Sequence, residues 1–265
     1  MPTAKPKSRR TIASVQRALD ILDLFNNGQN ELGNAEIARL VGLPVGTASG
    51  LIYTLKINNY LDQNPTNRKY RLGMKLAERA AILLDQLDIR KISAQYLEEL
   101  RIWCDESINL AMRDGLEVVY IERLFGNHAL GIRSELGKRG PLHSTALGKA
   151  IFSFLPEAEY DSIMSRYEFF TVTPFTITDR EQFNLEAQKI RKLGYAVDEQ
   201  ENEMGGRCVG APIFDHTGYP IAAISISVPI QRLPIESVKE FGSKLIEAAG
   251  RISQQMGHSS ESYRP

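Results

Sequence analysis

The amino-acid sequence predicts an α+β fold in two parts: an N-terminal winged helix-turn-helix and a C-terminal antiparallel sheet with helices packed on it. Three observations predict this fold. Apolar residues recur at helical spacing in three short segments before residue 60. A strand-turn-strand pattern follows the third segment. From residue 108 on, strand and helix patterns are mixed and several strand pairs have short hairpin connections, which favours an antiparallel sheet over a doubly wound parallel one.

The first 60 residues have the order of a helix-turn-helix. We take Ser14 as the N-cap of the first helix. The apolar positions of that helix are Val15, Ala18, Leu19, Leu22 and Phe25. A second short helix follows Asn34 and ends at Gly42, and a third begins near Thr47. Two helices joined by a short glycine-containing turn are typical of a helix-turn-helix.

A hairpin pattern follows the third helix directly. Tyr60-Leu61 and Tyr70-Arg71-Leu72 are its expected strands, and Asn64-Pro65-Thr66-Asn67 supplies its turn. A hairpin in this position is a wing. Its tip and return strand carry three cations, Arg68, Lys69 and Arg71.

The remaining elements follow from periodicity and turn signals. Residues 74–89 are expected to form a connecting helix. Later helices are expected over residues 92–105 and 144–154, after Pro156, from Thr178-Asp179 to Gly194, and over 235–256. Strands are expected over 108–113, 116–123, 128–133, 195–197, 208–214 and 221–228. The predicted domains are residues 1–73 and 90–257, with the helix 74–89 between them and a tail at 258–265.

Composition excludes several classes of protein. The chain has 265 residues, of which 43% are hydrophobic and 24% are charged, so it is not wholly disordered. No apolar stretch reaches the ~20 residues that cross a membrane, and the polar, basic N-terminus does not resemble a signal peptide. Cys104 and Cys208 cannot form a disulfide framework, and the four histidines lack metal-ligand spacing. We expect a cytoplasmic protein with no metal, no cofactor and no membrane partner.

The zero net charge hides an asymmetry along the chain. Residues 1–73 carry ten Lys and Arg against five Asp and Glu, an excess of five positive charges, and the rest of the chain carries the opposite excess. A basic N-terminal part on an acidic remainder indicates that the first 70 or so residues meet a polyanion.

The candidate DNA-binding residues lie in the arm, the third helix and the wing. We assign phosphate contacts to Arg9 and Arg10 in the arm and to the three wing cations. The residues expected at base edges are Pro44, Val45, Gly46, Thr47, Ser49, Gly50 and Tyr53. We expect Val45 and Ala48 to pack on thymine methyls, and the glycines to let the helix approach the backbone closely.

The residues expected at base edges include none of the Arg, Lys, Gln and Asn side chains that usually read bases. We therefore expect specificity to depend on DNA shape and on the arm in the minor groove. A plain helical lobe is the alternative interpretation of the three helices.

Residues 140–150 place small and hydroxyl side chains at a helix N-terminus. The unpaired N–H groups and the helix dipole at such a terminus favour an anion, so a carboxylate can dock there. The alternative is plain capping by Ser144, with Gly148 and Ala150 as close-packing contacts.

A second group of polar residues belongs to three expected strands. Asp198 ends one strand, Cys208 starts the next, and Ser225 and Ser227 lie two apart on the one after, so the two serines share a face. Buried hydroxyls need hydrogen-bond partners, which a ligand, the backbone or water can supply. Cys208 fits equally well as a small buried apolar residue.

At these residues the sequence closely resembles the IclR family of bacterial transcription regulators, over residues 12–256. The motifs that carry the resemblance are Gly42-Leu43-Pro44, Asn59-Tyr60-Leu61, Tyr70-Arg71-Leu72-Gly73, Pro141-Leu142-His143-Ser144-Thr145-Ala146-Leu147-Gly148-Lys149-Ala150, Gly194-Tyr195-Ala196-Val197-Asp198, Arg207-Cys208-Val209-Gly210-Ala211-Pro212-Ile213-Phe214-Asp215 and Ile224-Ser225-Ile226-Ser227. The C-terminal half looks most like the 2-keto-3-deoxygluconate repressor subgroup.

The resemblance implies a winged-helix domain, a connecting helix and a GAF-like effector domain, in homodimers that often pair into tetramers. It implies control by a small organic acid. The family's ligand positions correspond here to Ala146, Leu147, Asp198, Cys208, Ser225 and Ser227, with Ile132 as an apolar wall. Many relatives carry Lys or Ser after the turn proline and His-Arg in the recognition helix. This chain has Val45, Gly46, Ser49 and Gly50 there, which leaves its operator sequence open.

The main hypothesis is a homo-oligomeric transcription regulator, and not an enzyme, on a palindromic or near-palindromic operator. Repression is the favoured outcome of binding, and activation is the alternative. The amides of Ala146 and Leu147 and the two serines would hold a carboxylate-bearing effector. An ionised Asp198 would repel that anion, so we assign Asp198 to an effector hydroxyl or a structural hydrogen bond.

Two rival hypotheses remain. One is a thiol-based redox sensor or enzyme that uses Cys208 with His143 or Asp198 as its partner. The other is an architectural DNA-binding protein with no ligand.

Overall fold

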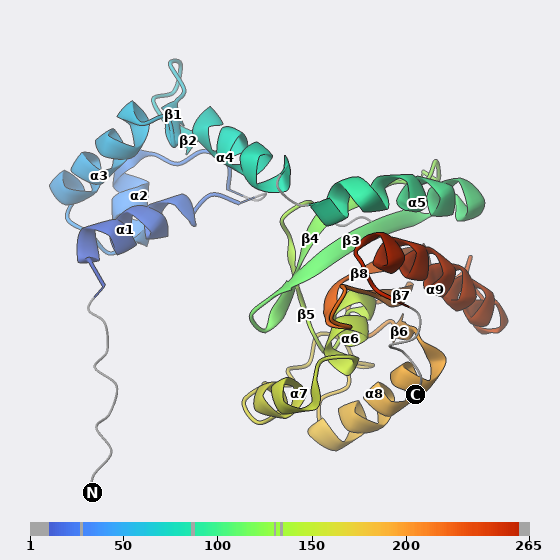
Figure 1. The fold of residues 1–265 in the computed structure, drawn as a ribbon. Helices are drawn as coiled ribbons and strands as arrows, with labels where there is room; N and C mark the ends of the chain where they lie inside the picture. The colour runs from blue at the N-terminus through green and yellow to red at the C-terminus, as the bar shows by residue number, and fades with distance from the viewer. Residues whose placement is uncertain (1–10, 27–28, 86–87, 130, 133–134, 260–265) are drawn as a thin grey trace, which may run out of the picture. The chain divides into compact units, whose positions relative to one another are not determined.

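The computed structural model describes residues 11–26, 29–85, 88–129, 131–132 and 135–259. The chain divides into two compact units, Met1–Gln86 and Leu87–Pro265 (Figure 1). The expected connecting helix belongs to the first unit. Arg9 and Arg10 lie outside the described residues.

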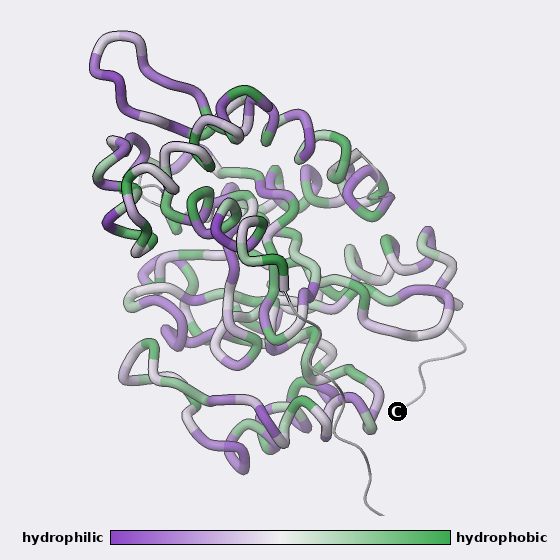
Figure 2. Tube along the Cα trace, turned by 90° about the vertical axis from the view of Figure 1, so that its left-hand side faces the viewer, coloured by the Kyte–Doolittle hydropathy of each residue, from purple (hydrophilic) through white to green (hydrophobic). Residues whose placement is uncertain are grey.

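The first unit is a helix-turn-helix followed by a two-stranded wing, as predicted. Its elements are α1 (Ala13–Leu22), α2 (Asn34–Leu40), α3 (Val45–Ile57), β1 (Leu61–Gln63), β2 (Tyr70–Leu72) and α4 (Met74–Asp85). In the turn between α2 and α3, Gly42 has a φ of 66°, a left-handed conformation that favours glycine. The core of the unit consists of Ile21, Phe25, Leu32, Ile37, Ala38, Ala48, Ile52 and Leu61. Figure 2 shows the loop of the wing as mostly hydrophilic.

The N-cap expected for α1 was wrong. The helix begins at Ala13, so Ser14 lies inside its first turn and no side chain caps its start. Of the predicted apolar positions, Val15 and Leu19 are exposed and Phe25 is buried, and Ile21, which is not one of them, is fully buried. The sequence spacing marks an apolar stripe correctly, but α1 packs on α3 through a neighbouring face.

The second unit is a six-stranded antiparallel sheet with helices on both faces. Its strands are β3 (Ser107–Asp114), β4 (Glu117–Leu124), β5 (Arg139–Pro141), β6 (Ala196–Glu199), β7 (Gly206–Phe214) and β8 (Pro220–Pro229), in the order β5-β4-β3-β8-β7-β6. Its helices are α5 (Asp88–Cys104), α6 (Ala146–Ser153), α7 (Glu157–Met164), α8 (Arg180–Leu193) and α9 (Val238–Gln255), the last preceded by a 3₁₀ turn. Helices α5 and α9 cover one face, and α6 with α7 and α8 covers the other (Figure 1).

The strand expected at residues 128–133 was wrong: the described residues of this segment contain no strand. After β4 the chain is held against the start of β3 instead. A Cβ on Gly126 would lie 1.8 Å from the Asp105 carbonyl oxygen, and the Asn127 amide donates to the Asp105 carboxylate at 2.7 Å. The chain then returns as β5, which pairs with the start of β4 at Glu117 to Val119.

The other elements follow the sequence closely. The β3–β4 hairpin turns at Gly115, which has a φ of 64°. Asp179 caps α8 by accepting from the Gln182 amide at 2.8 Å, and Gly194 ends that helix in the left-handed conformation. Among the described residues, no single helix is both long enough and apolar enough to span a membrane.

Candidate functional site

The N-terminal half of α3 presents an exposed surface with unusually little side-chain bulk. Val45 and Thr47 are exposed at the start of the helix, and Tyr53 is 63% exposed further along. A Cβ added to Gly46 or Gly50 would meet no atom within 4 Å, so packing within the chain does not require either glycine. Each nevertheless costs about 1 kcal/mol of helix stability relative to alanine. This surface is open to a close approach by another molecule.

Two α3 residues have roles that the sequence did not reveal. Ala48, expected to contact thymine methyls, is fully buried in the core, so that expectation was wrong. The Ser49 hydroxyl accepts from the Asn34 amide at 2.7 Å and donates to the Val45 carbonyl at 2.7 Å. Ser49 therefore links α2 to α3.

The three cations of the wing differ in their surroundings. Arg71 pairs with Asp62 on the adjacent strand at 2.7 Å, so its charge is partly balanced. Arg68 and Lys69 are exposed at the tip, and neither forms an ion pair with a described residue. The amides of Asn64 and Asn67 donate to the Glu31 carboxylate at 2.9 and 2.7 Å, which lowers the pKa of Glu31 and ties the wing to the helical part of the unit.

In the second unit, the seven predicted effector residues line one cavity between α6 and the sheet. They are Ile132, Ala146, Leu147, Asp198, Cys208, Ser225 and Ser227. The other lining residues are Tyr120, Lys138, Thr145, Asn202, Glu203 and Gly206. The volume of the cavity is about 30 Å³. In this conformation the cavity has room for about two waters.

Strand register brings the polar residues together. Asp198 on β6 pairs with Cys208 on β7, which pairs with Ser227 on β8, so the three form a row across the sheet. Ser225 lies two residues from Ser227 on the same face, as predicted. Asn109 on β3, which the sequence pattern did not single out, is also buried in this region. It donates to the hydroxyls of Ser225 and Ser227 at 3.4 and 3.2 Å. Only the register, which a single sequence does not show, places Asn109 beside the serines.

The first turn of α6 forms the opposite wall of the cavity. Its N-cap is Thr145, which accepts from the Gly148 amide at 2.9 Å, so the alternative interpretation with Ser144 as the cap was wrong. The Ser144 hydroxyl instead donates to Asn202 at 3.2 Å. The amides of Ala146 and Leu147 occupy the first turn, where the helix itself supplies no carbonyl partner.

Glycines allow this turn to sit close to its neighbours. A Cβ on Gly210 would lie 2.8 Å from the carbonyl oxygen of Ala146, and one on Gly148 would lie 2.5 Å from that of Pro141. A Cβ on Gly206 would lie 2.7 Å from the Cδ1 atom of Ile132 at the apolar wall. The cavity is therefore shaped by backbone approaches that other residues would prevent.

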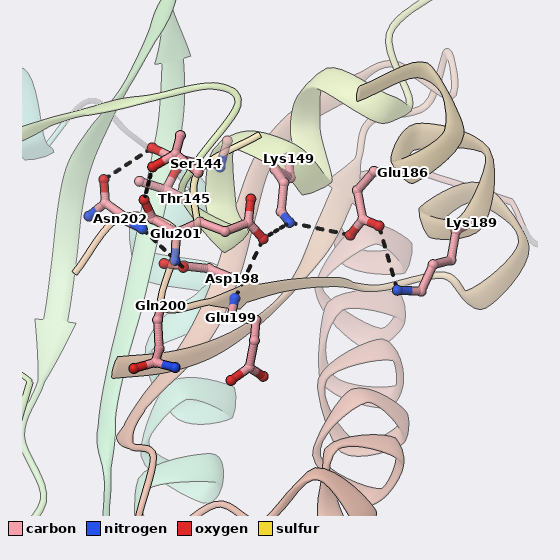
Figure 3. Close-up of polar contacts among 12 residues, drawn as sticks. Ser144, Thr145, Lys149, Glu186, Lys189, Asp198, Glu199, Gln200, Glu201 and Asn202 are labelled. Atoms are coloured by element: carbon pink, nitrogen blue, oxygen red, sulfur yellow. Dashed lines mark hydrogen bonds and ion pairs between the residues drawn. The ribbon is translucent and has the colours of Figure 1, made fainter. Parts of the chain in front are cut away.

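A buried charge network adjoins the cavity at Asp198 (Figure 3). The Lys149 ammonium, which is fully buried, contacts Glu201 at 2.5 Å and Glu186 at 3.3 Å. Asp198 accepts from the backbone amides of Glu201 and Asn202 at 2.7 and 3.2 Å. Burial, followed by the nearby Glu201 carboxylate, raises the pKa of Asp198 to about 7.

The surroundings of Cys208 do not favour thiol chemistry. Burial and the neighbouring Asp198 carboxylate raise the pKa of Cys208 well above its usual value, whereas a reactive cysteine needs a lowered one. The adjacent Arg207 instead pairs with Glu199 at 2.5 Å. His143 bonds to Tyr167 and to the Phe170 carbonyl and does not line the cavity. Nothing here supports the redox or enzyme alternative.

The described residues contain no group of three or more His, Cys, Asp and Glu side chains that could hold a metal ion.

Comparison with known proteins gives matches over both units. The IclR helix-turn-helix domain matches residues 14–65, and the C-terminal domain of bacterial IclR transcriptional regulators matches residues 81–254. The regulator XynR of Escherichia coli K12 is 40% identical over 93% of this chain and 98% of its own. KdgR of the same organism is 32% identical over 95% of each chain. The chain is therefore similar to KdgR, as expected, but its sequence identity to XynR is higher.

A solved structure agrees with these matches. An IclR homologue from Microbacterium hydrocarbonoxydans, complexed with 4-hydroxybenzoate, is 25% identical and superposes with a TM-score of 0.80 over 92% of this chain and 98% of its own. The matches cover the helix-turn-helix and the domain that contains the cavity. The chain belongs to the IclR family of bacterial transcriptional regulators.

Proposed function

We propose that this regulator is a cytoplasmic repressor whose affinity for a palindromic or near-palindromic operator is controlled by a small carboxylate-bearing metabolite. Residues 1–73 bind DNA, residues 90–257 bind the acid, and α4 connects these two domains. The observation that carries the proposal is the convergence of two serines, an aspartate and a helix N-terminus on one cavity of the second unit, in a chain whose first unit is a basic winged helix. The KdgR and AllR relatives are named as regulators or repressors, and a homologue is complexed with a carboxylic acid.

In the proposed DNA complex, α3 enters the major groove and the wing contacts phosphates. Gly46 and Gly50 lie four residues apart and so share one face of α3, together with Tyr53. Their missing side chains let the helix axis come nearer to the DNA than alanines would. This role explains why two helix-weakening residues stand on an exposed face.

Gly46→Ala and Gly50→Ala are expected to change stability and binding in opposite directions. Each should raise the free energy of unfolding by up to ~1 kcal/mol, because alanine favours the helix. Each should also weaken operator binding by about tenfold, equivalent to about 1.4 kcal/mol, because the added methyl group holds the helix away from the DNA. Chemical denaturation and fluorescence anisotropy measure the two effects. Gly250→Ala is the matched control, because its Cβ also meets open space but in α9; it should stabilise without affecting DNA binding.

Replacing Arg68 and Lys69 together with Gln is expected to weaken binding to all duplexes alike. Loss of two phosphate contacts should reduce the slope of log Kobs against log salt by about 1.8. Arg71→Gln should have a smaller effect, since Asp62 already balances its charge. A loss restricted to one operator variant would contradict phosphate contact and indicate base readout.

We also propose that the chain forms homodimers, or dimers of dimers, through its first unit. Large apolar side chains are exposed on α1 and α4 and just before α1: Ile12, Val15, Leu19, Met74, Ile82 and Leu83. A second copy that covers them would remove this apolar surface from water. It would also match the symmetry of a palindromic operator.

Leu19→Glu with Leu83→Glu is expected to convert the dimer to a monomer in sedimentation equilibrium. Both side chains are at least half exposed within the chain, so their replacement should leave the fold of the unit intact by circular dichroism. Leu185→Glu on α8, equally exposed but in the other unit, should remain at least dimeric. A double variant that still dimerises at low micromolar concentration would refute this interface.

The cavity suits the anionic end of an acid. Free amides of the α6 N-terminus provide donors and a favourable dipole on one wall, and the Ser225 and Ser227 hydroxyls provide hydrogen bonds on the other. Because the open volume is small, an acid has to displace the side chains at its mouth. Bound and free forms would then differ in conformation, as regulation requires.

Ser225→Ala with Ser227→Ala is expected to abolish stabilisation by acids in a thermal-shift screen of pyruvate, 2-keto-3-deoxygluconate and 4-hydroxybenzoate. A cognate acid at one hundred times its Kd should stabilise the wild type by about 2.7 kcal/mol. Operator affinity without acid should be unchanged. The control is Ser153→Ala, a buried serine of α6 outside the cavity lining, which should keep the full response. Equal acid potency in the double variant would exclude the serines from the site.

A further inference from the structure

The charges around Asp198 do not balance if every group is ionised. Lys149 is the buried cation of the network, and it contacts Glu201 and Glu186 rather than Asp198. Glu186 is also approached by the exposed Lys189 at 3.5 Å. Asp198 has no ion pair with a described residue and is 4% exposed. An isolated buried carboxylate is costly, and such a group takes up a proton instead.

Glu201 adds a second buried carboxyl group close to Asp198. It follows Asp198 by three residues, is likewise buried, and its Oε2 atom has no hydrogen-bond partner among the described residues. Contact with the Lys149 ammonium at 2.5 Å keeps Glu201 the better-stabilised anion of the two. Of the two carboxyl groups, Asp198 is therefore the one that takes up a proton more readily.

The groups that face Asp198 from the surrounding elements support this assignment. They are Lys149 on α6, Glu201 and Glu203 after β6, Cys208 on β7, Tyr120 on β4 and Lys138 at the opening, and Glu186 on α8 acts on Lys149 and Glu201 behind them. The acids outnumber the cations, and Lys138 is exposed to solvent. Both amides donate to Asp198 Oδ1, and the Cys208 side chain is hydrogen-bonded to the same carboxyl group. Neither amide donates to Oδ2, so that atom can carry the proton.

We propose that Asp198 carries a proton at neutral pH and donates this O–H to the carboxylate of the bound acid, so that effector binding and proton uptake are one event. The inference rests on the proposed function, because it concerns the same cavity. It replaces the expectation that Asp198 contacts an effector hydroxyl. The proton removes the repulsion between two carboxylates, and a neutral acid donor makes a charge-assisted hydrogen bond to the anion.

The proposal determines how the Kd for the acid changes with pH. The pKa of Asp198 in the free protein is about 7, and a bound anion beside it raises that pKa further. Between the two pKa values, binding takes up a proton. The Kd for an acid should thus be constant well below pH 7 and rise about tenfold per pH unit above it.

The first test needs no effector. Carbon-13 NMR of the aspartate carboxyl groups follows the protonation of Asp198, which is assigned by its loss in Asp198→Asn. A midpoint near 7 supports the proposal. A midpoint below about 5, close to that of an ordinary aspartate, would overturn it whatever the protein binds.

The second test measures proton uptake with named probes, pyruvate and 2-keto-3-deoxygluconate. Both are fully ionised from pH 6 upward, so any pH dependence comes from the protein. Calorimetry at pH 8 in two buffers of different ionisation enthalpy should give about one proton taken up per acid bound, and Kd should rise about tenfold from pH 7.5 to 8.5. Binding without proton uptake would refute the proposal.

Asp198→Asn keeps the shape of the side chain and a donor, but removes the titration. It should bind either probe with a Kd that changes less than about twofold from pH 6 to 8.5. Asp161→Asn, an exposed residue of α7, should keep the wild-type pH profile. If neither probe bound the wild type even at pH 6, the proposed effector class would be wrong, while the NMR midpoint would still decide the protonation of Asp198.

Discussion

The close approach of helix α6 to strand β7 is the constraint on which the effector cavity depends. It exists because Gly210 on β7 has no side chain where a Cβ would lie 2.8 Å from the Ala146 carbonyl oxygen of α6. Gly148 in turn lets the start of α6 fold back on Pro141, where a Cβ would lie 2.5 Å from the carbonyl oxygen. These contacts hold the first turn of α6, whose amides have no partner within the helix, over the row formed by Asp198, Cys208 and Ser227. A larger residue at Gly210 would separate the walls, so the chemistry of the cavity follows from packing.

Burial of polar groups gives the cavity its chemical character. Asn109 supplies partners for two serine hydroxyls that would otherwise be costly to bury, and Lys149 does the same for Glu201. The α6 amides and Asp198 line the cavity and can interact with a molecule bound there. The small free volume means that an occupant must move the lining, and a ligand alters DNA affinity only through its different interactions with two conformations.

The sequence was sufficient for the elements with strong local signals and for the seven cavity residues. The start of α8 at Asp179 and its end at Gly194 are local features, and the structure confirms them. Asn109 beside the serines and β5 in place of a strand at 128–133 depend on long-range register, which a single sequence does not show. The cap of α6 is local, but Thr145 and Ser144 are both good N-caps, so the sequence does not distinguish them. Periodicity marked an apolar stripe on α1 without revealing that Val15 and Leu19 are exposed within the chain.

Reciprocal coupling between acid and operator tests the central claim most directly. The operator Kd of the full chain is measured with and without a saturating acid, and the acid Kd is measured with and without operator. The account predicts that both ratios are the same factor, about 5 to 150, because one free energy connects the two sites. An acid that binds and stabilises the cavity domain, yet leaves the operator Kd unchanged, would contradict it.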